Sequence, residues 1–344
     1  MSFDPPTSPL VGSPLKALIS HPLQFFLQWR RTQTPPSLAA TQPWRWFLPF
    51  LIVVPMLGIA GALHKTTVIF PEGAALAFGV FVLVIPGWTV SRWRLMVVLP
   101  IAALYGVGLA YLSIPFALEM IAGISGVLIL LHFIRSMLAP SISATLIPIV
   151  FHIHSWFYPA TVIGVSIAIT LIGSMLARTA PQAPTPSLLS LRRSVSVKFW
   201  IISVVWILIV TTLHLPKVML APPLFVSTYE IAGVSTSFKL QLSRATIFGV
   251  LGFLGVALLS IASSDEIAGL ATFTIGLVYM AIARRYHPPI LSIALLALIA
   301  GPIVDWKFGL YLAIGSLGLY FLNSVFELST KQIKFFQRNG SSVS

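Results

Sequence analysis

The sequence contains no cysteine and few charged side chains. Only 8% of its 344 residues are Asp, Glu, Lys or Arg, whereas soluble domains carry about 25%. Without cysteine, the chain has no disulfide framework, thiolate nucleophile or cysteine-ligated metal. The composition also excludes a disordered chain, which needs few apolar residues and much charge.

Sequence motifs of the common enzyme classes are absent as well. The chain has no Walker phosphate loop, no strand-borne Gly-x-Gly-x-x-Gly, no His-Glu-x-x-His and no Gly-x-Ser-x-Gly. Its seven histidines are scattered, and His152 and His154 are two residues apart and share no helix face. We therefore expect neither an enzyme nor a metal site nor a bound cofactor.

Long apolar segments dominate what is present. Hydrophobic residues make up 57% of the chain, and a membrane-spanning helix needs about 20 of them in succession. The sequence predicts an all-α polytopic membrane protein with about twelve transmembrane helices and no sizeable extramembrane domain. The predicted spans are residues 46–63, 72–87, 95–113, 118–134, 141–155, 158–177, 199–215, 222–238, 245–262, 267–283, 288–304 and 308–326.

The basic residues predict the orientation of these spans. The net charge is +13, and Lys and Arg accumulate in the cytoplasmic loops of membrane proteins. With both termini in the cytoplasm, every Lys and Arg except Lys65, Lys217 and Lys307 lies on that side. We therefore interpret the charge as a topology signal rather than as a nucleic-acid surface. The expected location is a bacterial inner (plasma) membrane, and a plastid envelope is also open.

The chain divides into two halves with similar markers. Because each half has an even number of spans, the halves should be parallel repeats related by an axis along the membrane normal. The matched markers are Arg94, Arg135 and Trp156, and then Arg244, Arg285 and Trp306. The predicted parts are a cytoplasmic N-terminal segment with an interfacial helix (1–44), a six-span repeat (45–177), a cytoplasmic linker (178–198), a second six-span repeat (199–326) and a cytoplasmic tail (327–344).

The second and fifth spans of each half begin with proline and small residues. The first N–H groups of a helix are unpaired and its N-terminus carries a partial positive charge, so helices that begin within a membrane suit a small anion. Three spans per quarter would make the quarters of each half inverted repeats. The alternative is that proline starts ordinary spans and small residues mediate packing. The predicted substrate-binding residues are Pro71, Glu72, Gly73, Ala74, Pro140, Ser141, Ser143, Thr145, Pro223, Ser227, Thr228, His287, Pro288, Pro289 and Ser292.

Two carboxylates fall inside the predicted spans, Glu72 and Glu230. A carboxylate in hydrocarbon is costly and normally faces a bundle interior or a water-filled cavity, so both are candidates for proton coupling. Glu72 also suits the first turn of a helix as a structural acid. Arg135 and Arg285 each precede a fifth span, where they could attract anions or anchor lipid phosphates.

The segment Tyr286-His287-Pro288-Pro289 resembles the His-Pro-Pro signature of the HPP family of integral membrane proteins. The openings at 70–75 and 141–145 look like that family's small-residue openings on two spans. The resemblance extends over 45–177 and 199–326, as a tandem two-copy form. It implies a transporter and, from cyanobacterial and plastid relatives, nitrite as the solute.

These observations predict a secondary transporter or channel-like facilitator for a small inorganic anion, with nitrite the leading candidate. A transporter of another small neutral or cationic solute remains an alternative, as does a non-transport membrane scaffold or assembly factor. A transporter predicts a polar cavity lined from 71–75, 140–145, 222–230 and 287–292, whereas a scaffold predicts fully packed cores. The lipid bilayer is an expected partner, nucleic acid is not, and a homo-oligomer is left open.

Overall fold

The computed structural model describes residues 42–85, 88, 92–176, 189–232, 237–301 and 305–340. Within these residues the chain forms helices and no strands, which confirms the all-helical class. The interfacial helix expected before residue 42, and residues 178–188 of the expected linker, lie outside the described residues.

Eight helices are long and apolar enough to cross a bilayer, counted over the described part of the chain. This agrees with an integral multi-pass membrane protein. Their bounds are Phe50–Leu63 (α3, extended to Pro43 by the 3-10 turn η2, Pro43–Phe47), Arg92–Ala110 (α6), Phe116–Phe133 (α7), Phe157–Leu176 (α9), Leu189–Thr212 (α10), Phe238–Ile261 (α12), Asp265–Ala283 (α13) and Phe308–Gly340 (α15).

Four further helices are short, and the prediction of twelve spans is therefore confirmed only for eight. They have 11 or 12 residues, which at 1.5 Å per residue is about 16–18 Å, roughly half the hydrocarbon thickness. All four fall in the predicted second and fifth spans of the two halves. Their bounds are Pro71–Phe81 (α4), Pro140–Val150 (α8), Pro222–Ala232 (α11) and Pro289–Ala300 (α14).

Local sequence explains where the short helices begin and end. Proline opens each of them, where its missing N–H has no helical partner. Phe70 is extended before α4, with φ −114°. Gly301 ends α14 with φ +49°, a conformation that side-chain-bearing residues rarely adopt. Apolar sequence continues past the ends of α4 and α14, which is why hydropathy alone predicts longer spans there.

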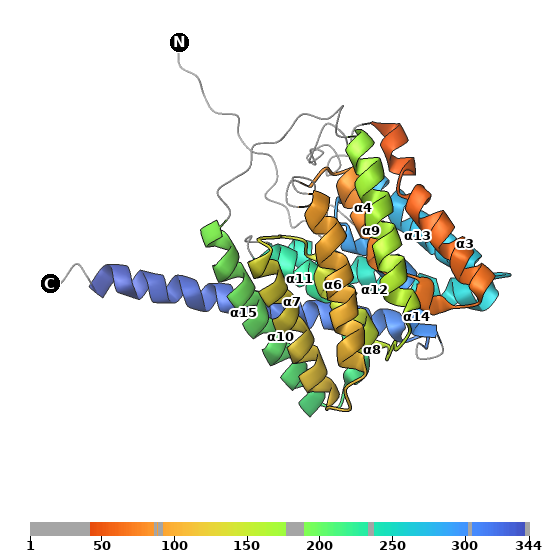
Figure 1. The fold of residues 1–344 in the computed structure, drawn as a ribbon. Helices are drawn as coiled ribbons and strands as arrows, with labels where there is room; N and C mark the ends of the chain where they lie inside the picture. Colours follow the sequence, from red (N-terminus) through yellow and green to blue (C-terminus); the bar gives the residue numbers. More distant parts are fainter. Residues whose placement is uncertain are drawn as a thin grey trace, which may run out of the picture.

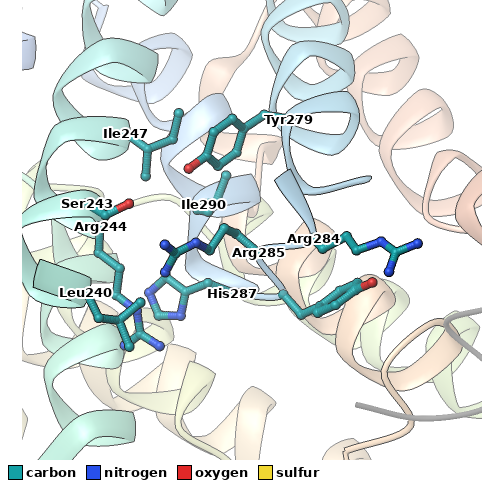
Figure 2. A pocket seen from close by; sticks show the side chains of 10 residues that line it. Leu240, Ser243, Arg244, Ile247, Tyr279, Arg284, Arg285, His287 and Ile290 are labelled. Atoms are coloured by element: carbon teal, nitrogen blue, oxygen red, sulfur yellow. The ribbon is translucent and has the colours of Figure 1, made fainter. Parts of the chain in front are cut away.

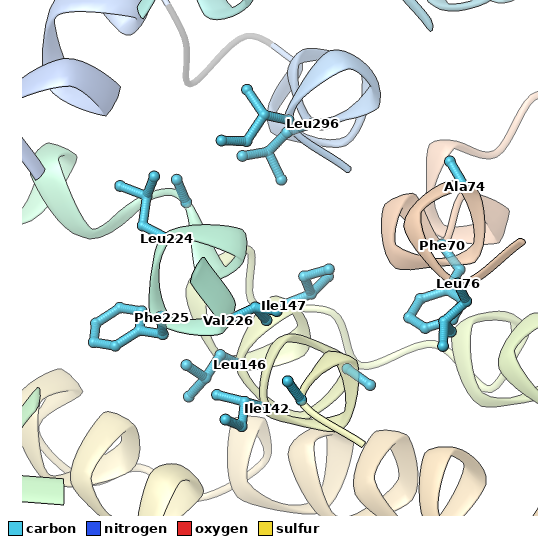
Figure 3. Close-up of a cluster of buried hydrophobic side chains, with 14 of the residues drawn as sticks. Phe70, Ala74, Leu76, Ile142, Leu146, Ile147, Leu224, Phe225, Val226 and Leu296 are labelled. Atoms are coloured by element: carbon cyan, nitrogen blue, oxygen red, sulfur yellow. The ribbon is translucent and has the colours of Figure 1, made fainter. Parts of the chain in front are cut away.

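The short helices form the core of the bundle. Every residue of α4, α8 and α14 is buried, and in α11 only Glu230 is not. The helices α8 and α11 contact each other, and Figure 3 shows the apolar side chains of Ile147 and Val226 between them, with Phe225 on the other side of α11. The long helices instead expose large apolar side chains such as Met175 and Phe253, as expected for a lipid-facing surface.

The two halves interlock through a matching set of contacts. In the first half α6 packs against α8 and α9, and in the second half α12 packs against α14 and α15. Figure 1 shows α6 and α9 side by side, with α7 next to α10. Between the halves, α3 contacts α13 as α10 contacts α7, and α4 contacts α14 as α11 contacts α8. Each short helix therefore packs against a short helix of the other half as well as against helices of its own half.

A basic side chain caps the C-terminus of two short helices, α4 in the first half and α11 at the corresponding place in the second. The Arg45 guanidinium, 2% exposed, donates from Nη1 to the Phe81 carbonyl at the end of α4 (3.1 Å). Lys198 Nζ donates to the Ala232 carbonyl at the end of α11 (3.1 Å) and pairs with Glu327 (3.0 Å). A cation at a helix C-terminus satisfies its unpaired carbonyls and complements its dipole. Lys198 lies within α10, which begins at Leu189 inside the expected linker; α15 likewise continues to Gly340 through the expected tail.

Candidate functional site

The first turns of α4 and α8 meet in the core of the first half. Glu72 is the second residue of α4 and Ser143 the fourth residue of α8, and the Ser143 hydroxyl donates a hydrogen bond to Glu72 Oε1. Both residues are buried. The contact brings together two helix N-termini, which carry partial positive charge. Their Gly73, Ser141 and Ile142 N–H groups already donate to the Phe70, Leu138 and Ala139 carbonyls. Two of the predicted residues thus share one site.

The Glu72 carboxyl is only partly satisfied in this site. Its Oε2 atom is buried and has no hydrogen-bond partner among the described residues. The neighbouring Tyr158 hydroxyl donates instead to the Ala144 carbonyl of α8 (3.2 Å). A buried carboxyl oxygen without a hydrogen-bond partner lowers the stability of the fold. Packing alone therefore does not explain why a carboxyl group stands at this position.

In the second half, a polar chain joins α11, the start of α14 and α15. His287, just before α14, has Nε2 2.9 Å from Ser227 Oγ and Nδ1 3.4 Å from Glu230 Oε2. The Ser227 hydroxyl is also hydrogen-bonded to the Tyr320 hydroxyl of α15. The Phe248 ring stacks on the imidazole, with centroids 5.6 Å apart. Both nitrogens of His287 are therefore engaged, and three predicted residues lie together.

A pocket of about 260 Å³ opens beside His287. It lies between the start of α12, the end of α13 and the segment that leads into α14. Figure 2 shows the Arg285 guanidinium beside the His287 ring and that of Arg244 close by, whereas Arg284 points away. Arg244 is close enough to interact electrostatically with Glu230, His287 and Tyr320. The lining residues are Leu240, Ser243, Arg244, Ile247, Tyr279, Arg284, Arg285, Tyr286, His287 and Ile290. Of the four segments from which the sequence predicts a cavity lining, only 287–292 contributes to this pocket, through His287 and Ile290.

Several predicted residues do not contribute polar groups to either site. The hydroxyls of Ser141, Thr145 and Thr228 donate to the backbone carbonyls of Leu138, Ala102 and Leu224. Arg135 is exposed, and its carbonyl accepts a hydrogen bond from Arg94 Nη1 (2.7 Å). The remaining predicted residues are buried within or next to the short helices: Pro71, Gly73, Ala74, Pro140, Pro223, Pro288, Pro289 and Ser292.

Sequence reasoning missed Arg244, Tyr320 and Asn323. Arg244 lies near the start of a span, where the positive-inside rule already accounts for a basic residue, so its sequence position does not mark it as functional. Asn323 is fully buried, three residues after Tyr320 on α15, and neither atom of its amide has a partner among the described residues. Asparagine within an apolar run was a signal that could have identified it.

Comparisons with protein-family models, with curated proteins and with solved structures find no match to this chain.

Proposed function

We propose that this chain is a membrane transport protein for a small inorganic anion, working as a secondary transporter or a channel-like facilitator. Nitrite is the leading substrate, on the resemblance to the HPP family. The observation that carries the proposal is the meeting of the α4 and α8 first turns at Glu72 and Ser143. Short helices that begin inside a membrane protein are typical of transport sites.

In this proposal Glu72 couples protons to the anion. The carboxylate occupies the place that two helix N-termini offer to a negative charge. An arriving anion competes with the ionised carboxylate for that place, whereas a protonated Glu72 leaves it free. Binding of the anion and binding of a proton are then linked, and the two would cross the membrane together.

The architecture we propose is a tandem repeat of two six-helix units of parallel orientation, each built from two inverted three-helix quarters. The paired contacts α6 with α8 and α9, and α12 with α14 and α15, support the tandem repeat. The matched cations Arg45 and Lys198 at the ends of α4 and α11 support it further. In this proposal both termini lie in the cytoplasm, as the loop charges predict, and the membrane is a bacterial inner membrane.

Anion flux into proteoliposomes tests the function. The full chain is purified, reconstituted and assayed for nitrite uptake, with nitrate, chloride and formate for comparison, each with and without a pH gradient. We expect saturable nitrite entry that a pH gradient accelerates. Flux no greater than in empty liposomes for all four anions, with protein shown to be folded by circular dichroism, would overturn the proposal.

A glycine pair supplies the matched variants. A Cβ at Gly73, in the first turn of α4, would lie 3.1 Å from Val165 Cγ1, whereas one at Gly164 on α9 would meet nothing within 4 Å. We expect Gly73→Val to abolish saturable uptake and Gly164→Val to leave it unchanged. Equal uptake by the two variants would show that the α4 first turn is not on the transport path.

A further inference from the structure

The pocket beside His287 is lined by none of the described residues of α4 or α8, and it has its own chemistry. Its lining includes three arginines, one histidine and two tyrosines, and no carboxylate. The Glu230 carboxylate lies 3.4 Å from His287 Nδ1, on the α11 side of the ring. Positive charge therefore exceeds negative charge around the pocket, which favours an anion over a cation.

Arg244 has a donor that the protein does not satisfy. Its Nη1 atom is buried and has no hydrogen-bond partner within the described ranges. Guanidinium N–H groups bind oxyanions in a fork geometry, and buried donors are normally paired. The same guanidinium lines the pocket, so a rotation of the Arg244 side chain would bring this donor to a ligand oxygen.

We infer that this pocket binds a small free oxyanion, with Arg244 and Arg285 as its charged contacts and His287 as its inner wall. The inference rests on the proposed function, for which it supplies an anion site at one mouth of the protein. Ser227 and Tyr320 hold the His287 ring in place from the protein side. A volume of about 260 Å³ accommodates an oxyanion of a few atoms together with water.

An oxyanion could also come from a lipid phosphate, so the binding experiment has two arms. Full-length protein in detergent is titrated with nitrite, nitrate or sulfate in one arm and with phosphatidylglycerol in the other, and binding is followed by calorimetry. We expect at least one of the free oxyanions to bind. Binding of phosphatidylglycerol alone, or of nothing, would overturn the inference.

Variants assign the binding to the pocket. Arg244→Gln removes the unpaired donor and the charge, and we expect it to weaken oxyanion binding about ten- to a hundredfold. Arg244→Lys keeps the charge without the fork, and we expect an intermediate loss. Arg94→Gln is the control, because Arg94 is the matched marker of the first half and its Nε is likewise buried without a partner among the described residues, but it lies outside the pocket. Equal affinity in Arg244→Gln and Arg94→Gln protein would overturn the inference.

The binding and flux experiments fail separately. Arg244-dependent binding by a protein that gives no flux would leave the pocket assigned and overturn transport. Saturable flux whose apparent affinity for the anion is the same in Arg244→Gln and wild-type protein would support transport and overturn the pocket as the anion site. Thermal unfolding of each variant in detergent, compared with the wild type, shows whether a loss of binding reflects a loss of folding.

Discussion

Replacing Ser143 by alanine should destabilise the protein more than a typical hydrogen-bond deletion in a membrane protein. Such deletions cost about 0.6 kcal/mol on average, because partners remain in the unfolded state. Among the described residues, Ser143 is the one side-chain donor to Glu72 Oε1, and Oε2 has no partner. Ser143→Ala therefore leaves a buried carboxyl with neither oxygen paired by a side chain of that part of the protein. We expect a loss of about 1–3 kcal/mol.

Removing the carboxyl as well should restore most of that stability. In the variant Glu72→Leu/Ser143→Ala both partners are replaced by apolar groups, which is nearly neutral when shapes are conserved, and every other residue of the α4 helix is buried. We expect the double variant to lie within about 1 kcal/mol of the wild type while it loses its response to a pH gradient. The Glu72 carboxyl would then serve function at the expense of stability.

Equilibrium unfolding in mixed micelles, followed by far-ultraviolet circular dichroism, measures all four members of this double-mutant cycle. Two outcomes would refute the reasoning: a cost below about 0.6 kcal/mol for Ser143→Ala, or a double variant whose loss equals the sum of the single losses. Either result would mean that the two side chains are not coupled in the folded protein.

Two further pairs of variants test the packing with the same unfolding assay. Arg45→Met should lower the free energy of unfolding by about 1–3 kcal/mol, because it leaves the end of α4 uncapped. The control is Lys65→Met: Lys65 is exposed and its ammonium lies over an aromatic ring, so the loss should be about 1 kcal/mol or less. Equal losses in the two variants would contradict the capping role of Arg45. Gly106→Ala should destabilise by about 1–3 kcal/mol, since its Cβ would lie 2.2 Å from the Thr145 carbonyl oxygen. A Cβ at Gly108, on the same helix, would meet nothing within 4 Å, so Gly108→Ala should instead stabilise the protein by up to about 1 kcal/mol. If both variants changed the free energy of unfolding in the same direction, a close approach of α6 to α8 would be refuted.

The starts of the short helices could be predicted from sequence, but their lengths could not. Pro71, Pro140 and Pro289 mark the beginnings because proline fits a first helical turn. The ends are hidden, because a helix covered on all sides by protein is as apolar as one covered by lipid. Hydropathy therefore extends α4 to residue 87 and α14 to residue 304, past the turns that end them at Phe81 and Ala300.

The candidate site was predictable as a set of residues but not as a set of contacts. Glu72 and Ser143 could each be identified from a proline-opened helix, yet nothing local connects residues that far apart in the chain. Glu230 and His287 were likewise identified singly, and their pairing follows only from how α11 packs beside the start of α14. Arg244 was out of reach, because what marks it is its place in the wall of a pocket, which only the folded structure shows.

The packing of short helices of one half against short helices of the other has a consequence for biosynthesis. During translation α4 and α8 emerge long before α14 and α11, the helices that pack against them. Until those later helices arrive, each early core helix lacks one of its walls and is too short to bridge the bilayer by itself. Assembly must therefore wait for the second half. Two fragments divided between α9 and α10 should each be degraded when produced alone in cells and accumulate when produced together.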